Sequence, residues 1–316
     1  MYPYYGASGI IDYIDEYIFD GDYILLSEDG ANIIDRNYRV AFIANGKIWV
    51  NNHAHVLQPH KEMNINFLSE ALERINYAIY NTGTTMPKLN QEICRKINLN
   101  VPSLSEQNKI GNLLYLLNER IATQNRLIEK LQSLIGGIAQ HCIKEAISGS
   151  MGIKLGDICK ITTGKLDANA QVDNGLYPFF TCAEQPFKID NFAFDTEALL
   201  ISGNGANLGY VNYYNGKFNA YQRTYVLDAF SENIQYIKWA LKVLLPKRIA
   251  IEKSSSNTPY IVLSTLSDLR LPIPSKGNQC HMAELMQSLE RKLSNQIALK
   301  SSYNMLKQYL LRQMFI

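Results

Sequence analysis

Amide, guanidinium and ammonium side chains gather in polar stretches of the second half of the chain. Such groups suit a nucleic acid, because paired donors and acceptors match base edges while cations and backbone N–H groups match phosphates. Gln222 or Asn257 is suited to adenine, and Arg223 to guanine. Lys165 and Lys253 are suited to phosphate. The candidate contacts in this half are Thr163, Gly164, Lys165, Asn204, Asn207, Tyr221, Gln222, Arg223, Lys253, Ser255 and Asn257.

The first half of the chain carries a smaller set of the same kind. Each residue in either set has an ordinary alternative as a turn residue or as a loop amide with locally satisfied hydrogen bonds. The loops as groups are therefore stronger candidates than any single member. The candidates in the first half are Asn32, Asn51, Asn52, His53, Thr84 and Lys88.

Motifs for catalysis or metal binding are weak. Asn257-Thr-Pro-Tyr260 is faintly similar to the Asn/Asp-Pro-Pro-Tyr element of adenine methyltransferases, but it lacks the second proline and a glycine-rich cofactor loop. Gly203-x-Gly205 lacks the βαβ setting of a dinucleotide site. We predict a non-catalytic protein without cofactor or metal, with a self-sufficient adenine methyltransferase as the enzyme alternative. The neighbouring histidines His53, His55 and His60 have no Asp, Glu or Cys at metal-ligand spacing that would complete a metal site.

The composition is that of an ordinary globular protein. The 316 residues are 47% hydrophobic and 19% charged, with a net charge of +2. No apolar run reaches the roughly 18–20 residues of a membrane span, and no secretory signal is visible. The five Cys form no CxxC pair, so we expect a reducing cytoplasm. The small net charge argues only against charge-dominated binding, because residues 1–100 carry 12 acidic and 8 basic side chains and residues 276–316 carry 2 and 6.

An internal repeat organises the whole chain. Matches between the two halves keep their order over about 140 residues, with slips of a few residues between them. Such a series indicates a tandem duplication of one long unit, because loop-length changes between two copies produce short slips. The matches include Tyr2-Pro3 with Tyr177-Pro178, Asp20 with Asp195, Gly30-Ala31-Asn32 with Gly205-Ala206-Asn207, Asn45-Gly46-Lys47 with Asn215-Gly216-Lys217, Gln107 with Gln279, and Gln124 with Gln296.

Each copy opens with a β-rich half. A turn signal lies at Phe19-Asp-Gly-Asp22. Asn-Gly flanked by alternating apolar residues, at Asn45-Gly46 and at Asn215-Gly216, predicts two β-hairpins. Short helices are expected over residues 65–80 and 234–245. In each copy a polar loop follows the short helix. A strand comes next and ends at proline 102 in the first copy and at proline 274 in the second.

Each copy closes with one long amphipathic helix. Apolar residues recur at alternating steps of four and three over residues 105–147, which predicts a coiled-coil seam. The second helix has a looser seam, which includes Leu306. We expect the two helices to pack antiparallel, with Gln124 and Gln296 setting the register; ordinary core helices with an incidental Gln are the alternative. The predicted seam residues are Ile110, Leu114, Leu117, Ile121, Gln124, Ile128, Leu131, Ile135, Leu289, Leu293, Gln296, Tyr303 and Leu310.

These elements predict an α+β fold with a pseudo-twofold internal repeat. Two β-rich domains, residues 1–101 and 149–273, are separated by two long helices, residues 102–148 and 274–316, packed as an antiparallel coiled coil. Two similar but non-identical binding domains held apart by helices suit a target with two different half-sites. Duplex DNA is the leading case.

Four stretches carry a family pattern. Ile153-Lys-Leu-Gly-Asp-Ile158 precedes Thr162-Thr-Gly-Lys165; Ser202-Gly-Asn-Gly-Ala-Asn207 follows; and Pro102-Ser-Leu-Ser-Glu-Gln107 leads into a long helix. Over nearly its full length the chain thereby resembles the specificity subunit of type I restriction–modification systems. The resemblance implies two target recognition domains, each reading one half of a split asymmetric site in double-stranded DNA. It also implies spacer helices that dock two adenine-methylating modification subunits and, through them, restriction subunits.

The first copy departs from this family pattern. It begins at the equivalent of Tyr177 and has no counterpart of residues 152–176, so we expect an N-terminally incomplete first recognition domain. In the second copy, Pro274-Ser-Lys-Gly-Asn-Gln279 lacks the family's Glu. The alternative function is a truncated or phase-variable subunit that binds methyltransferase subunits without full specific DNA recognition.

Overall fold

The chain folds into two compact units, each a β-sheet combined with parts of two long helices. The structure, a computed structural model, describes residues 1–149, 152–252 and 260–315. The first unit comprises Met1–Arg126 with Ile297–Ile316, and the second comprises Leu127–Gln296. No helix in the described part of the chain has the length and apolarity needed to cross a bilayer.

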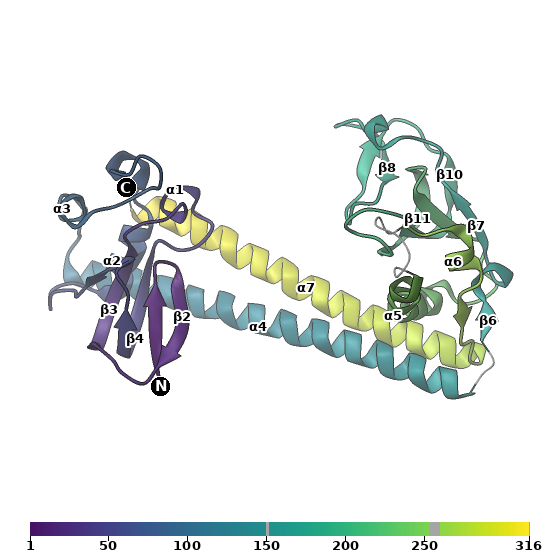
Figure 1. Cartoon of the computed structure of the whole chain (residues 1–316), viewed down its shortest axis with the longest axis horizontal. Coiled ribbons are helices and arrows are strands. Elements are labelled where there is room, and N and C mark those ends of the chain that lie inside the picture. The colour runs from purple at the N-terminus through teal and green to yellow at the C-terminus, as the bar shows by residue number, and fades with distance from the viewer. Residues whose placement is uncertain (150–151, 253–259, 316) are drawn as a thin grey trace. The chain divides into compact units, whose positions relative to one another are not determined.

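The sheet of the first unit has five strands in the order β2-β1-β4-β3-β5 (Figure 1). Its strands are β1 (Tyr2–Gly6), β2 (Gly9–Ile14), β3 (Phe19–Ser27), β4 (Ala41–Val50) and β5 (Ala54–Leu57). The β1–β4 pair is parallel and the others are antiparallel. The short helices of this unit are α1 (Asn32–Asp35), α2 (Ile65–Glu73), the 3-10 turn η1 (Tyr77–Tyr80) and α3 (Gln91–Cys94).

The sheet of the second unit repeats this order and adds one strand. Its order, β7-β12-β10-β11-β8-β9, read backwards is the order of the first sheet plus β7. The strands are β7 (Lys160–Thr163), β8 (Tyr177–Phe180), β9 (Phe187–Ile189), β10 (Phe194–Ser202), β11 (Val211–Ala220) and β12 (Thr224–Asp228). A separate pair joins β6 (Ile153–Lys154) to β13 (Arg270–Leu271). The helical elements are η2 (Leu155–Asp157), η3 (Ala168–Ala170), α5 (Ile234–Glu252) and α6 (Leu263–Ser267).

The two sheets share one register, which confirms the predicted internal repeat. Asp20 of β3 pairs with Lys47 of β4, and the matching residues Asp195 and Lys217 pair between β10 and β11. The parallel pairing of β1 with β4 recurs between β8 and β11. The matches found in the sequence therefore reflect equivalent places in one repeated sheet.

The predicted Asn-Gly hairpins are wrong. Asn45-Gly46 lies in the middle of β4 and Asn215-Gly216 in the middle of β11, and both strands continue through the dipeptide. Gly46 pairs with Gly21, so the turn signal at residues 19–22 also lies inside a strand. Gly46 has φ 76° and Gly216 φ 128°, values that L side chains rarely adopt. The glycines permit a distorted backbone within a long strand, and the ladder on β3 or β10 outweighs the local turn preference.

Two helix ends also differ from the prediction. The helix expected over residues 65–80 ends at Glu73, and Asn76 caps a separate 3-10 turn with its side chain. The helix expected to end at residue 245 continues to Glu252 through Pro246. Proline costs a helix one backbone hydrogen bond, but here Ile249 beyond it is buried in the core. Tertiary packing thus sustains the last turns.

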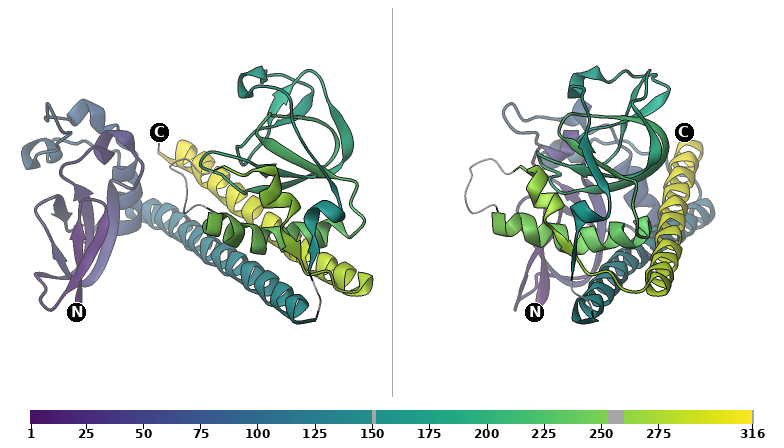
Figure 2. Two further views of the ribbon diagram at one scale, coloured as in Figure 1. Left: turned by 45° about the vertical axis from the view of Figure 1, so that its right-hand side comes forward. Right: turned by 90° about the vertical axis from the view of Figure 1, so that its right-hand side faces the viewer.

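The long helices are α4 (Leu104–Gly149) and α7 (Lys276–Met314). The N-terminal part of α4 belongs to the same unit as the C-terminal part of α7, and the reverse holds in the other unit, so the helices run antiparallel (Figures 1 and 2). The predicted α4 seam is turned inward: Leu114, Leu117, Gln124, Leu131 and Ile135 are buried.

One seam position of α7 was wrongly predicted. Leu306 is 46% exposed, whereas the Lys307 side chain is only 15% exposed. Steps of four and three from Leu289 through Gln296 and Tyr303 lead to Lys307 rather than Leu306. The prediction failed because it chose the apolar residue over the heptad position, and a lysine stem can line an apolar seam.

A glutamine at the start of each long helix ties it to the neighbouring domain in the same way. Gln107 accepts a hydrogen bond from the backbone N–H of Asn64 at 3.0 Å and donates to the Pro102 carbonyl at 3.0 Å. Gln279 makes the two equivalent bonds, to Asn233 and Pro274, at the same distances. Both side chains are buried, so each amide satisfies backbone groups that would otherwise be costly to bury.

A buried charge cluster holds the first sheet domain to both long helices. Glu70 of α2 is 5% exposed and lies 2.7 Å from Arg39, 3.4 Å from Lys307 of α7 and 3.0 Å from the amide of Asn118 of α4. Burial works to raise the pKa of Glu70, but the Arg39 and Lys307 charges and the hydrogen bonds hold it below its usual value. The carboxylate is therefore the charged form in the folded protein at neutral pH.

The second unit makes the equivalent contact with the charges reversed. Lys238 of α5 lies 2.7 Å from Glu290 of α7, and Lys242 lies 3.7 Å from the same carboxylate. Both units thus hold a sheet-side helix against a spacer helix by an ion pair. The apolar core of the second unit is continuous from the sheet through α5 to both long helices.

Candidate nucleic-acid interface

In the second unit the predicted loops converge at one end of the sheet. The N–H of Gly164, after β7, donates to Thr224 O at 3.2 Å, and that of Gln222, in the β11–β12 turn, donates to Leu166 O at 2.9 Å. The N–H of Gly203, after β10, donates to Arg223 O at 2.8 Å. Backbone bonds therefore bring three of the predicted loops together. Gly164 is required here, because a Cβ would lie 1.9 Å from Ala220 O.

Several candidate side chains in this cluster already have partners. Gln222 donates from Nε2 to Asp167 Oδ1 at 2.9 Å, and its side chain is exposed. Asn207 is half-buried and donates to Cys182 O at 3.0 Å. Asn207 therefore acts as a structural loop amide, while Gln222 has an exposed amide held in position by a neighbouring carboxylate.

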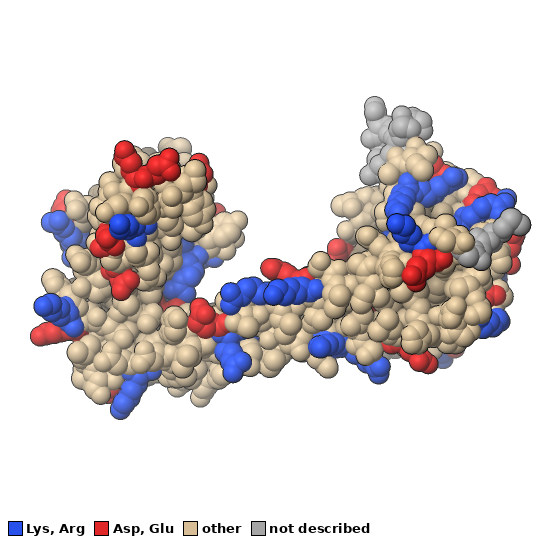
Figure 3. All heavy atoms as spheres, turned by 90° about the horizontal axis from the view of Figure 1, so that it is seen from below, with Lys and Arg blue, Asp and Glu red and all other residues tan. Residues whose placement is uncertain are grey.

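The cations of this cluster are available. Lys165 and Arg223 are both exposed. Over residues 1–149, 152–252 and 260–315 neither of them forms an ion pair. Two unpaired cations beside an oriented amide can bind phosphate and base edges together. On the face shown in Figure 3, basic and acidic side chains are mixed.

The remaining candidates of the second unit fall into two groups. Thr163 is exposed, and Asn204 and Tyr221 are half-buried, all within the loop cluster. Asn204 forms an isolated β-bridge with Tyr260, a residue that is 57% exposed. Gly205 has φ 79°, so this glycine serves a turn. Three candidates lie outside the described residues: Lys253, Ser255 and Asn257.

The first unit builds the same cluster from the matching loops. Glu28 N–H donates to His53 O at 2.8 Å, and Leu89 N–H donates to Glu28 O at 2.7 Å. These bonds are equivalent to those that Gly203 makes with Arg223 and Ile261 in the second unit. The loop arrangement is therefore a property of the repeat.

The electrostatics of the first cluster differ from those of the second. His53 Nδ1 lies 2.8 Å from Asp29, and Lys88 lies 3.4 Å from Glu28. The candidate side chains His53 and Lys88 thus both lie against carboxylates. No group of three potential metal ligands gathers within the described residues. Asn32 closes a loop through two hydrogen bonds to Tyr38. Asn51 accepts from the His53 N–H, while Asn52 and Thr84 are exposed.

Two members of the second cluster were missed in the sequence. Asp167 accepts a hydrogen bond from the Gln222 amide and so orients it. The backbone carbonyl of Cys182 accepts a hydrogen bond from the Asn207 amide. Asp167 follows the Thr-Thr-Gly-Lys stretch, which was a usable signal. Cys182 follows β8, which reaches the cluster only because β8 pairs in parallel with β11. No local pattern predicts a parallel pairing between distant segments.

One known protein family matches both halves of the chain. The family model described as the type I restriction modification DNA specificity domain matches residues 1–133 and again residues 148–300. The chain belongs to this family. Each of the two matched segments of this chain contains one sheet and one loop cluster.

Relatives in the family match over different lengths. The EcoDI specificity subunit of Escherichia coli is 42% identical over 137 residues, which is 43% of this chain and 30% of the relative. A putative specificity subunit of Haemophilus influenzae is 36% identical over 112 residues, 35% of this chain and 29% of the relative. The chain therefore spans about three-tenths of these two relatives. A putative specificity subunit of Mycoplasma pneumoniae is 24% identical, over 91% of this chain and 81% of the relative.

Solved structures show the same fold. The type I restriction–modification S subunit from M. genitalium superposes with a TM-score of 0.74, covering 100% of this chain and 88% of that one at 20% identity. A subunit from a structural study of type I R-M complex assembly gives a TM-score of 0.53 at 18% identity. These likenesses confirm the predicted fold class, two sheet-rich domains with long helices between them.

Proposed function

We propose that this protein is the non-catalytic DNA-specificity subunit of a type I restriction–modification complex in the cytoplasm. In this proposal the two β-rich domains each read one half of a bipartite, asymmetric site. The helices α4 and α7 dock two modification subunits that methylate adenine, and restriction subunits join through these. No cofactor is needed by the specificity subunit itself.

The duplicated loop cluster carries this proposal. Each unit brings its equivalent loops to one end of its sheet by equivalent backbone bonds, but the side chains differ, with Arg223 in one copy and His53 in the other. Two similar frames with different side chains suit two different half-sites. Family membership supports the same function.

A genome-wide methylation map tests the proposal. The chain is expressed with modification subunits of a related system in a host that lacks adenine methylation, and methylated adenines are then mapped. We expect a split motif with a fixed gap and non-identical halves. A contiguous palindrome or sequence-independent methylation would contradict the proposal. Partner binding without any methylation would favour the alternative, a subunit that occupies methyltransferases without full DNA recognition.

Substitutions in the loop cluster of the second unit separate base reading from phosphate binding. Arg223→Ala is expected to weaken binding of the assembled complex to its own site by about 1–3 kcal/mol and to relax one position of the motif, because a bidentate base contact is lost. Lys165→Ala is expected to weaken binding to all sequences alike and to lower the salt slope by roughly 1. Fluorescence anisotropy with matched and mismatched duplexes at several salt concentrations measures both.

Lys160→Ala is the matched control for Lys165→Ala. Lys160 is also exposed, but it begins β7, whereas Lys165 follows the end of that strand at the loop cluster. We expect the control to bind like the unchanged protein. Equal losses from both lysines would mean that the loop cluster is not the contact surface.

A further inference from the structure

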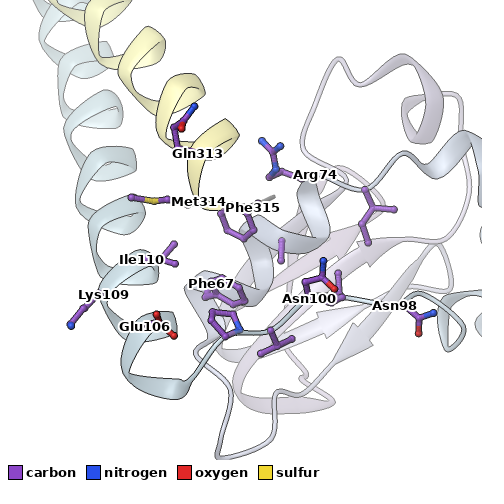
Figure 4. Close-up of a pocket in the computed structure, with 15 residues that line it drawn as sticks. Phe67, Arg74, Asn98, Asn100, Glu106, Lys109, Ile110, Gln313, Met314 and Phe315 are labelled. Carbon is purple, nitrogen blue, oxygen red and sulfur yellow. The ribbon is translucent and has the colours of Figure 1, made fainter.

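The loop cluster of the second unit contains a polar side chain that is exposed and yet held in one orientation. In the groove of the first unit, of about 820 Å³, Phe67 and Phe315 stack on each other with ring centroids 5.1 Å apart, so these rings serve packing (Figure 4). In the second loop cluster, Gln222 and Asp167 are both exposed, and a 2.9 Å hydrogen bond joins them. An exposed hydrogen bond adds little net stability, because water offers both groups the same bonds when they are apart. The main effect of this bond is therefore to orient the amide.

The backbone fixes both ends of this pair. Leu166 forms an isolated parallel β-bridge with Tyr221, and Asp167 and Gln222 are the residues that follow these two. The N–H of Gln222 donates to Leu166 O at 2.9 Å, and the N–H of Tyr221 donates to Phe180 O at the same distance. The two side chains therefore start from neighbouring points of one hydrogen-bonded frame.

The chemistry of the pair determines which way the Gln222 amide faces. A carboxylate can only accept hydrogen bonds, so the amide nitrogen, not the amide oxygen, must face Asp167. A primary amide has two N–H groups and one carbonyl. The bond to Asp167 uses one N–H, and within residues 1–149, 152–252 and 260–315 the side chain has no other hydrogen-bond partner. One N–H and the Oε1 carbonyl of Gln222 remain for a ligand.

The two groups that remain match adenine and mismatch guanine. In the major groove adenine presents the N7 acceptor beside the N6 amine, which together need one N–H and one carbonyl. Guanine presents two acceptors, N7 and O6, which need two donors. With one N–H bonded to Asp167, Gln222 would turn its carbonyl oxygen toward one of the guanine acceptors, and two acceptors facing each other form no hydrogen bond.

We infer that Asp167 is a positioning residue that sets base specificity: by holding the Gln222 amide, it selects adenine over guanine at one position of the half-site read by the second unit. This inference rests on the proposed function, because it needs the second loop cluster to face DNA. Asp167 acts through Gln222 and does not itself contact the base. Within the described part of the chain, neither Lys165 nor Arg223 forms an ion pair with this carboxylate, so it is committed to the amide.

Methylation by the assembled complex tests the inference. The full chain is combined with modification subunits of a related system, and a methylation map of Gln222→Ala first identifies the motif position that this side chain reads. Duplexes with A·T or G·C at that position are then compared by kcat/KM for methylation. The unchanged protein should prefer adenine. Asp167→Asn should lower that preference roughly tenfold or more, because an amide at position 167 can bond the Gln222 side chain in either orientation.

Three further measurements separate positioning from a merely structural role. Gln222→Ala combined with Asp167→Asn should have the same base preference as Gln222→Ala alone, because Asp167 acts only through that amide. Asp167→Asn should leave the thermal unfolding of the free chain unchanged, because both side chains are exposed. Asp173→Asn is the matched control and should keep the full adenine preference. Asp173 is also exposed, but it lies before the start of β8, whereas the loop cluster follows the end of that strand.

Failure of this inference is distinguishable from failure of the proposed function. A contiguous motif, or none, for the unchanged protein would contradict the proposed function. A split motif whose adenine preference survives Asp167→Asn would overturn the inference alone. The same holds if Gln222→Ala alters no position, or alters one where the unchanged protein does not prefer adenine. An equal loss of methylation on all duplexes, or a lower unfolding temperature with unchanged base preference, would show that Asp167 is structural and would also overturn it.

Discussion

Exchanging residues 153–272 for the corresponding segment of a family relative should change one half of the methylated motif and leave the other half unchanged. The exchanged segment contains the whole second sheet and its loop cluster, with Lys165, Gln222 and Arg223. The first sheet, the first cluster and both long helices remain. Because each cluster is built by bonds inside its own unit, one reader can be replaced without rebuilding the other.

The measurement is again a methylation map, compared before and after the exchange. The size of the effect is all-or-none for the affected half, because several base contacts of roughly 1–3 kcal/mol each are replaced together. The matched control exchanges residues 2–100 instead and should alter the opposite half. If both halves changed, or neither did, the assignment of one reader to each unit would be wrong.

Glu70→Ala should destabilise the first unit by about 3–5 kcal/mol, because removing one partner leaves a buried charge uncompensated. Lys307 is 15% exposed and would lose its carboxylate, and the Asn118 amide would lose its acceptor. Chemical denaturation at pH 7, followed by aromatic fluorescence and circular dichroism, measures the change in the free energy of unfolding. Glu92→Ala is the matched control, because Glu92 pairs with Lys96 on the surface and is 79% exposed.

The control should lose less than about 0.5 kcal/mol, as exposed pairs usually do. Replacing both partners, Glu70→Leu with Lys307→Leu, should recover much of the loss, since no buried charge then remains. A loss for Glu70→Ala as small as for Glu92→Ala would show that the cluster does not hold the domain to the helices.

The pH dependence of the Glu70 contribution has a definite sign. The folded pKa of Glu70 lies below its unfolded value, which is roughly 4.3 for a free Glu. A depressed carboxyl pKa contributes stability that is present above the unfolded pKa and is lost as pH falls through the folded pKa. The difference between the unchanged protein and Glu70→Gln should therefore shrink as the pH falls below about 4.

The amino-acid sequence by itself determined the repeat, the long helices and the inward face of α4. These features rest on spacing along the chain: matched residues in order, and apolar residues at steps of four and three. In a helix, residues three and four apart lie on one face, so the spacing in the sequence predicts which side chains are buried. Hence Leu114, Leu117 and Leu131 could be assigned to the buried face, and the loops after β7 and β10 could be grouped as candidates.

Only the tertiary structure decided what depends on partners distant in the sequence. Asn45-Gly46 carries a strong local turn preference, yet pairing with β3 keeps it inside a strand. Lys307 is a polar residue at a seam position and becomes acceptable because Glu70, 237 residues away, supplies its counter-charge. Long-range pairing energy outweighs local preference at each of these places, and local patterns cannot report it.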